Sequence, residues 1–467
     1  MSQQDLQEEH VPLKSRISVT SADAIVAFVQ TFVGGGLLNY WYTTSMGLNP
    51  IWAIVVWGIF GAWNMINDPL FGALSDNTTH SLGRRIPYIR YGGPILGLFY
   101  ILSWLPIAPG NQMVLFVQFL ITLFLYDTLW TAVATSLYVM PYEMAVSNKA
   151  RGSIFIWKVF FTVIATLIPL VVLDFLKPAF GDNLWPYFIF HMILGICLTV
   201  ITFVSTFFYK EKIYVKYESQ VPFLESLKQT LTNRAFLVFE VISFTVVYCQ
   251  GGIIQGLLYF PGALEQSYYL MLVCVLLGVI IGVFLFAVKG KGLTVKKAVK
   301  RWVLIFAISC FLILVLGYFW IATLIGCVGI GIGLSGGLYL VPLLNGDVID
   351  YDESVTGQRR EGMYAGVNSF VTKYATSLAQ MIFLAIIVAF GYNTLLEPAE
   401  QTAIFADLGV IIAWMLVPSL LLFICFIAMK YYPLEGEEWL ETKRELEEIH
   451  KQKEKERLKE LGYEYKE

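Results

Sequence analysis

Charged residues are scarce in this chain, and histidine is scarcer still. Asp, Glu, Lys and Arg make up 14% of the 467 residues, against about a quarter in ordinary soluble proteins, and only 4 residues are His. The 6 cysteines all stand in apolar runs, without the paired spacing that binds zinc or forms a disulfide framework. A formal net charge of -3 leaves no basic excess for nucleic acid. These shortages argue against a soluble enzyme, a zinc protein and a nucleic-acid-binding protein.

The sequence patterns of common catalytic sites are missing as well. No glycine-rich phosphate loop occurs, so transport driven directly by ATP is not indicated. No Ser/His/Asp set is placed for hydrolysis, because His191 is the only histidine inside an apolar run. The segment from Met1 to Val19 lacks the apolar core and cleavage site of a signal peptide, so we expect it to stay in the cytoplasm. We therefore expect neither an enzyme nor a bound cofactor.

Hydrophobic residues are abundant instead, at 57% of the chain, and they stand in long runs. A helix needs about 20 mostly apolar residues to cross a bilayer, where only intrahelical hydrogen bonds satisfy the backbone. About twelve runs qualify, and they lie near residues 20–43, 50–76, 90–109, 113–141, 152–176 and 185–209, and then near 236–260, 267–289, 300–320, 321–346, 362–392 and 405–430. The sequence therefore predicts an all-α membrane protein with twelve transmembrane helices.

The longest polar break falls midway through these runs, which suggests two six-helix halves. We expect a cytoplasmic N-terminal segment, an N-terminal half, a cytoplasmic linker, a C-terminal half and a charged cytoplasmic tail, at residues 1–19, 20–209, 210–235, 236–431 and 432–467. In the linker, Phe223, Leu224, Leu227 and Leu231 share one helical face, which is typical of an amphipathic helix on the membrane surface. A solvated linker with incidental leucines is the alternative.

Lysine and arginine predict the orientation. They crowd the loops on one side of the predicted membrane, whereas the loops on the other side carry only Lys177. Because positive charge collects on the cytoplasmic side, both termini should lie in the cytoplasm, with the chain in the plasma membrane.

Ionisable residues within the predicted helices are few. Each costs about 2.5 to 3.5 kcal/mol at the centre of a spanning helix, so each is a candidate for function. The set comprises Asp23, Asp68, Asp127, Lys158, Glu240 and Lys373. Asp23 and Glu240 stand near the ends of their runs, where an interfacial position is more usual than a functional one.

Asp68 and Lys373 are the candidates for ion coupling. Asn64 and Asp68 are four residues apart on one helix face, where their oxygens could begin a shell for Na⁺ or Asp68 could exchange a proton. Lys373 lies about eleven residues into its run, so its amine needs a carboxylate or an aqueous cavity. The alternative is a structural ion pair between Asp68 and Lys373 that moves nothing.

Asp127, Trp130 and Lys158 are the candidates for solute binding. Asp127 stands beside two threonines and Trp130, a mixture of carboxylate, hydroxyl and aromatic groups that can bind a sugar. Helix packing through hydroxyls is the alternative. Lys158 is about a turn and a half inside its run and could instead extend its amine to the cytoplasmic surface.

Several motifs carry a family resemblance. The runs are W-N-M-I-N-D-P-L-F-G-A-L-S-D at residues 63–76, L-G-R-R-I-P at 82–87, Y-D-T-L-W-T at 126–131, D-V-I-D-Y-D-E at 347–353 and T-G-Q-R-R-E-G-M at 356–363. Together they resemble the glycoside-pentoside-hexuronide:cation symporters, the melibiose permease-like branch of the major facilitator superfamily. The resemblance implies two six-helix halves and import of a glycoside with a cation by alternating access.

The resemblance also implies roles for residues. Asp68 matches the family's cation-site carboxylate, Lys373 the lysine that contacts that site, and Lys158, within one residue, an arginine that contacts sugar. Gly72, Asp76, Gly83, Arg84 and Arg85 match a superfamily loop signature, and we assign them, with Asp347, Asp350, Arg359 and Arg360, to a conformational gate. Physically, Arg84 and Arg85 can bridge carboxylates or helix C-terminal carbonyls. Positive-inside topology alone is the alternative explanation of these arginines.

One departure bears on the ion. Asn64 stands where sodium-coupled members have a second aspartate, so Asp68 is the one carboxylate on that face. A proton needs only one carboxylate, which favours H⁺ over Na⁺, although threonine hydroxyls and backbone carbonyls could complete a Na⁺ shell.

The sequence thus predicts a monomeric secondary active transporter that imports a sugar or glycoside-like solute with H⁺ or Na⁺. Two alternatives stay open. One is a symporter of lysophospholipid-like lipids from the same superfamily, and the other is a membrane receptor or scaffold that transports nothing.

Overall fold

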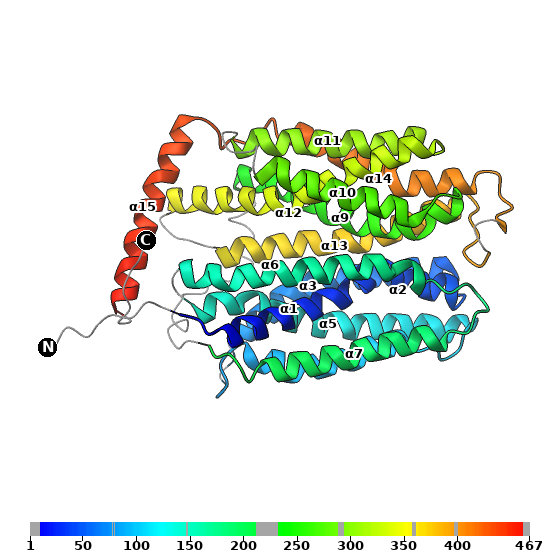
Figure 1. The fold of residues 1–467 in the computed structure, drawn as a ribbon, viewed down its shortest axis with the longest axis horizontal. Coiled ribbons are helices and arrows are strands. Elements are labelled where there is room, and N and C mark those ends of the chain that lie inside the picture. The colour runs from blue at the N-terminus through cyan, green and yellow to red at the C-terminus, as the bar shows by residue number, and fades with distance from the viewer. Residues whose placement is uncertain are drawn as a thin grey trace.

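The computed structural model describes residues 10–460 except 77, 79, 146–147, 212–231, 288–293, 357–360 and 397–399. Every regular element in these residues is helical, and the long helices run side by side in two groups (Figure 1). The all-α class predicted from the sequence is therefore confirmed. The expected amphipathic helix of the linker falls mostly in residues 212–231 and lies outside the described residues.

The first group is built from the N-terminal part of the chain. Its elements are α1 (Leu13–Gly34), α2 (Leu37–Tyr40), η1 (Trp41–Ser45), α3 (Pro50–Asp76), η2 (Tyr88–Gly92), α4 (Gly93–Ser103), α5 (Gln112–Met144), α6 (Asn148–Val172), η3 (Leu173–Leu176) and α7 (Trp185–Ser205). Helix α1 already begins at Leu13, inside the segment expected to precede the membrane. Asn111 caps α5, because its side chain accepts a hydrogen bond from the backbone N–H of Val114.

The second group follows the linker. Its elements are α9 (Arg234–Ala263), α10 (Tyr268–Ala287), α11 (Val295–Leu316), α12 (Trp320–Thr356), α13 (Glu361–Ala389) and α14 (Ala406–Ala428). Asn233 caps α9 by accepting hydrogen bonds from the N–H groups of Ala235 and Phe236. These caps satisfy N–H groups that have no partner within the helix.

Eleven of the described helices are long and apolar enough to cross a membrane. The third predicted span, near 90–109, is the exception. It forms one continuous helical stretch from Ile86 to Ser103 in which the π-helical turn η2 precedes α4, and neither piece is long enough alone. Large apolar side chains such as Ile156, Phe175 and Ile321 are about 70% exposed, as expected of faces that meet lipid. The chain is a multi-pass membrane protein.

Helix α15 (Glu437–Glu460) lies across the end of the bundle where α1 begins, which we call the α15 end (Figure 1). Its Lys443 Nζ is 2.5 Å from Asp347 Oδ1 of α12, and Asp347 is buried. Just before it, Glu435 pairs with Lys296 at 3.1 Å. The charge of the C-terminal tail predicts a solvated helix or a disordered extension, and the structure shows a helix that docks on the bundle.

The two groups touch at the opposite end of the bundle. The rings of Tyr40 and Tyr259 meet at 5.5 Å, and Gln380 Nε2 of α13 donates to the Gly34 carbonyl at 3.1 Å. Gly36 has a φ of 93°, which turns the chain from α1 into α2 under Gln255. Close packing of backbone and aromatic rings thus closes this end.

Helices α10 and α12 approach most closely at glycines. A methyl group on Gly331 of α12 would lie 2.0 Å from the Val275 carbonyl oxygen, and one on Gly278 of α10 would lie 2.0 Å from that of Val328. Small residues let membrane helices pack backbone against backbone, where dispersion is the main attraction. Close van der Waals packing at these glycines therefore holds α10 and α12 together.

Gly331→Ala should destabilise the protein, because the new methyl group has no space. We expect the free energy of unfolding in detergent to fall by about 1 to 3 kcal/mol, the usual cost of overpacking. Gly346→Ala on the same helix is the control, since nothing lies within 4 Å of its added methyl group. Equal unfolding midpoints for the two variants would contradict the close approach.

Candidate functional site

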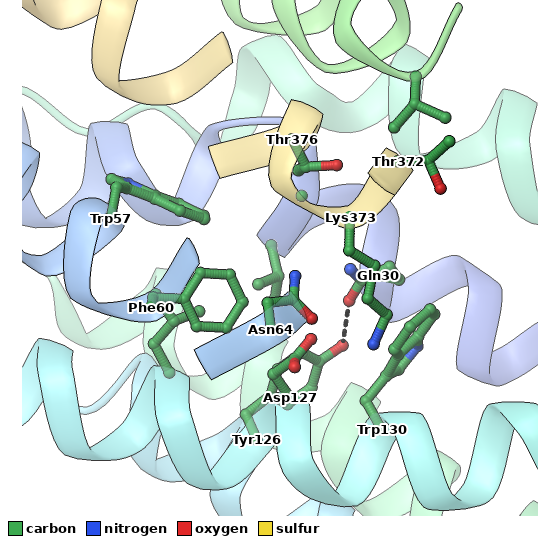
Figure 2. Close-up of a pocket in the computed structure, with 14 residues that line it drawn as sticks. Gln30, Trp57, Phe60, Asn64, Tyr126, Asp127, Trp130, Thr372, Lys373 and Thr376 are labelled. Atoms are coloured by element: carbon green, nitrogen blue, oxygen red, sulfur yellow. Dashed lines mark hydrogen bonds between the residues drawn. The ribbon is translucent and has the colours of Figure 1, made fainter. Parts of the chain in front are cut away.

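A cavity of about 180 Å³ lies between the two groups of helices (Figure 2). Its walls come from α1, α3 and α5 on one side and from α9 and α13 on the other. The lining residues are Gln30, Val33, Gly34, Trp57, Phe60, Asn64, Leu123, Tyr126, Asp127, Trp130, Val247, Thr372, Lys373 and Thr376. Aromatic rings therefore share this space with an amide, a carboxylate and an ammonium group.

Asn67 joins α3 to α5 behind this wall. Its Nδ2 donates to Asp127 Oδ2 at 2.9 Å and to Thr131 Oγ1 at 2.9 Å. Asn67 is 0% exposed and Asp127 is 3% exposed, so these hydrogen bonds are made away from water. The sequence analysis overlooked Asn67. Its position could have suggested a role in the site, because Asn67 is three residues from Asn64 and adjacent to Asp68.

Lys373 brings the second group of helices into the same cluster. Its Nζ donates to Thr131 Oγ1 at 2.6 Å and lies 5.4 Å from the centre of the Trp130 ring. A hydroxyl and an aromatic face both stabilise an ammonium group taken from water. Asp127, Asn67, Thr131 and Lys373 thus form one polar cluster across three helices.

Two amide oxygens in this region have no hydrogen-bond partner among the described residues, namely Oδ1 of Asn64 and Oδ1 of Asn67. Buried acceptors are usually satisfied, so such oxygens are available to a bound ion or hydroxyl. Asp68 follows Asn67 directly on α3, but its side chain lies outside the described residues. Its coupling role stays a prediction.

Lys158 is not among the residues that line the cavity. Its Nζ lies 3.1 Å from Asp23 Oδ2 of α1 and 5.3 Å from the centre of the Tyr138 ring of α5. Tyr138 is eight residues beyond Trp130 and is 59% exposed. Asp23, which the sequence suggested to be interfacial, is therefore the partner of Lys158 toward the α15 end, and both side chains are about one fifth exposed.

The predicted gate loop is partly described. Gly83 has a φ of 112°, and the Glu211 carboxylate lies against it and accepts hydrogen bonds from the N–H groups of Arg84, Arg85 and Ile86 at 2.6, 2.7 and 2.8 Å. A carboxylate at a helix start is favourable, because the free N–H groups and the helix dipole both attract it. The role of Glu211, just beyond α7, was not predicted.

The two loop arginines meet Glu143 at the end of α5. Arg85 Nε and Arg84 Nη2 lie 3.2 and 3.4 Å from Glu143 Oε1. Burial raises the pKa of the Glu143 carboxyl, and the Arg85 guanidinium opposes that rise. The expected bridge between these arginines and a carboxylate is therefore present, within the first group of helices.

Of the other gate residues, some lie on described helices and two lie outside the described residues. Gly72 and Asp76 belong to the last turns of α3, Asp76 with a side chain outside the described residues. Asp347 pairs with Lys443 of α15, and Asp350 follows it on α12. Arg359 and Arg360 lie outside the described residues. For all nine gate residues the gate role stays a prediction.

Gly83→Ala should disturb the loop more than Gly110→Ala. Both glycines have a positive φ, so both variants carry the same type of backbone strain. Only at Gly83 would the methyl group meet the Glu211 carboxylate, at 2.4 Å, since nothing lies within 4 Å of Gly110. We expect a lower unfolding midpoint for Gly83→Ala. Identical thermal unfolding of the two variants would refute this packing.

Known proteins share this architecture and sequence. The uncharacterised symporter YnaJ of Bacillus subtilis is 23% identical over 459 residues, or 94% of this chain and 95% of that protein. The putative glycoside/cation symporter YagG of Escherichia coli is 22% identical over 414 residues, which cover 85% and 87% of the two chains. The crystal structure of a D-xylose-proton symporter has a TM-score of 0.59 at 13% identity, over 87% of this chain and 96% of that one.

The structural likeness shows a fold shared with major facilitator transporters, and the named relatives confirm the resemblance found in the sequence motifs. The family model described as MFS/sugar transport protein matches residues 22–436. Because that match extends over most of the chain, the protein belongs to the MFS/sugar transport protein family, a family of transporters and not of enzymes.

Proposed function

We propose that the protein is a secondary active symporter that imports a sugar or glycoside-like solute together with a cation by alternating access. The observation that carries this proposal is the polar cluster of Asp127, Asn67, Thr131 and Lys373. It joins both groups of helices beside a cavity within the membrane-spanning part of the chain. Charged groups are kept at such a depth chiefly for ion and solute movement.

The cavity suits a small polar solute. Trp57, Phe60 and Trp130 offer faces that can cover the C–H side of a sugar ring, while Gln30 and Asp127 can hydrogen-bond its hydroxyls (Figure 2). A lipid with a long acyl chain would need a far larger and more apolar space. We assign Asp127 and Trp130 to solute contact on these grounds.

Lys158 extends the proposed solute path toward the α15 end. Its ion pair with Asp23 and the exposed ring of Tyr138 repeat the combination of charge and aromatic face. Tyr138 lies about 12 Å along α5 from Trp130, at 1.5 Å per residue. We propose that the solute meets this trio after it leaves the cavity.

Coupling is proposed to act through Asp68. A cation bound beside Asn64 and Asn67 would meet the positive charge of Lys373, so ion binding and the contact of Lys373 with Thr131 should oppose each other. That opposition links ion occupancy to the interface between the halves. One cation that crosses about 100 mV supplies roughly 2.3 kcal/mol, enough for about fiftyfold accumulation of a neutral solute.

The α15 end is proposed to be cytoplasmic, in the plasma membrane, with the protein acting as a monomer. Arg84 and Arg85 gather there, as positive charge does on the cytoplasmic side. We propose that the contacts of Arg85 with Glu143 and of Lys443 with Asp347 rearrange as this end opens and closes.

Asp68→Asn should abolish concentrative uptake and leave solute exchange partly intact, because the amide cannot carry a proton or a full negative charge. The measurement is uptake of glycosides, pentoses and uronides into proteoliposomes under separate H⁺ and Na⁺ gradients. Asp407→Asn, at the first turn of α14, is the matched control. Accumulation by Asp68→Asn to the wild-type level would show that the coupling assignment is wrong.

Asn64→Asp should shift the ion preference toward Na⁺. The wild type is proposed to use H⁺, since Asn64 offers only a neutral oxygen, and a second carboxylate on that face of α3 would favour a metal cation. Uptake at fixed membrane potential, with either gradient alone, measures the preference. Strict Na⁺ dependence of the wild type would contradict the proton assignment and leave symport intact.

A further inference from the structure

Glu240 is a buried carboxylate that does not belong to the polar cluster described above. It lies two turns into α9 and is 7% exposed. Neither of its carboxylate oxygens has a hydrogen-bond partner among the described residues. Two other buried acids of the described chain differ, because Glu143 meets Arg85 and Asp347 meets Lys443.

The helix face that carries Glu240 leads to the cavity. Asn233, Glu240 and Val247 are spaced by seven residues, so they lie on one face of α9. Asn233 caps the helix at the α15 end, and Val247 lines the cavity. Glu240 stands between them, about 10 Å along the helix from each.

Contacts on both sides of Glu240 show that this face meets α13. One turn before it, the Phe236 ring packs at 4.9 Å on the ring of Tyr364. Two turns after it, Tyr248 belongs to one buried cluster with Ala375 and Ala379 of α13. The Glu240 side chain therefore belongs to the seam between α9 and α13.

The facing side of α13 is polar. Tyr364, Asn368 and Thr372 follow one another at intervals of four residues, so they too share a face. The Tyr364 hydroxyl accepts from Asn233 Nδ2 at 3.1 Å, and Thr372 lines the cavity. Asn368 Oδ1, between them, is buried without a partner among the described residues. Polar groups thus follow the seam from the α15 end to the cavity.

The contacts described along this seam involve two titratable groups that carry no charge at neutral pH. Tyr364 of α13 and Cys425 of α14 are the titratable side chains that meet these turns of α9, the latter through Val241 and Thr245. Helix α12 meets α9 with Gly337, and its Asp347 pairs with Lys443. Lys373, farther along α13, donates to Thr131.

We propose that Glu240 is a second proton-binding site, which receives the proton from the cavity and passes it to water at the α15 end. A carboxylate without counter-charge or donor is costly in low dielectric, and taking up a proton removes that charge. The proton leaves the coupling carboxyl, binds one oxygen of Glu240 and is released to solvent, so no other reactant is needed. The proposal rests on the proton-driven function proposed above.

The test compares Glu240→Gln with Glu265→Gln. The second variant makes the same chemical change just beyond the opposite end of α9. In proteoliposomes we expect Glu240→Gln to lose at least about tenfold in proton-driven net uptake, because net transport needs proton release. Solute exchange needs no release, so it should stay near the wild-type rate, which also shows that the variant folds. Glu265→Gln should match the wild type in both assays.

Infrared spectroscopy gives a readout that does not depend on transport. Glu240 should contribute a protonated carboxyl band at neutral pH, which Glu240→Gln lacks and Glu265→Gln retains. A wild type that no proton gradient drives would overturn the proposed coupling. A proton-driven wild type whose Glu240→Gln variant matches it in net uptake and in the carboxyl band would overturn the Glu240 site alone.

Discussion

The arrangement of the two halves depends on the need to satisfy an ammonium group inside the membrane. Lys373 belongs to α13, yet its hydrogen bond goes to Thr131 of α5, in the other half. Helices α3 and α13 can hold it there because they pack closely, with Gly61 against Tyr374 and Gly58 against Met381. The buried ammonium group is thus stabilised by a hydroxyl of the opposite half, so a change at this contact affects the interface between the halves.

The two ends of the molecule are closed by different physical means. At the end remote from α15, backbone carbonyls and tyrosine rings pack together, as Gly34 with Gln380 and Tyr40 with Tyr259. At the α15 end the described contacts include ion pairs within each half, as Glu143 with Arg85 and Asp347 with Lys443. Opening the first end would separate packed rings, whereas opening the α15 end would bring the buried acids Glu143 and Asp347 and their cationic partners into water. Opening the two ends should therefore have different energetic requirements.

Much of the fold could be predicted because bilayer thickness and backbone hydrogen bonding constrain each helix separately. The third span was also predicted, near 90–109, but the π-helical turn before Gly93 was not. The sequence also indicated that Lys373 needs a partner, but not that the partner is Thr131. Local spacing reveals neighbours on one helix and says nothing about which helix lies opposite.

The same limit explains what the sequence missed or misplaced. The partners of Asn67 and Glu211 are 60 or more positions away along the chain, so the sequence near these two residues did not indicate what they contact. Lys158 was expected near the solute, and its partner Asp23 was set aside as interfacial because both lie near span ends. Asp127 was grouped with its neighbour Thr128, whose hydroxyl instead accepts from Trp63 Nε1 at 3.0 Å.

The two buried carboxylates Asp127 and Glu240 differ in their hydrogen-bond partners. Asp127 accepts a hydrogen bond from the Asn67 amide, which also donates to Thr131, and Thr131 in turn accepts from the ammonium group of Lys373. These groups stabilise the negative charge of Asp127. Glu240 has no such support among the described residues. A carboxylate whose negative charge is stabilised by hydrogen bonds can attract and orient an ion or solute, whereas a buried carboxylate without them is more stable when it is protonated. In the mechanism proposed above, Asp127 of one half therefore takes part in binding and Glu240 of the other half in proton release.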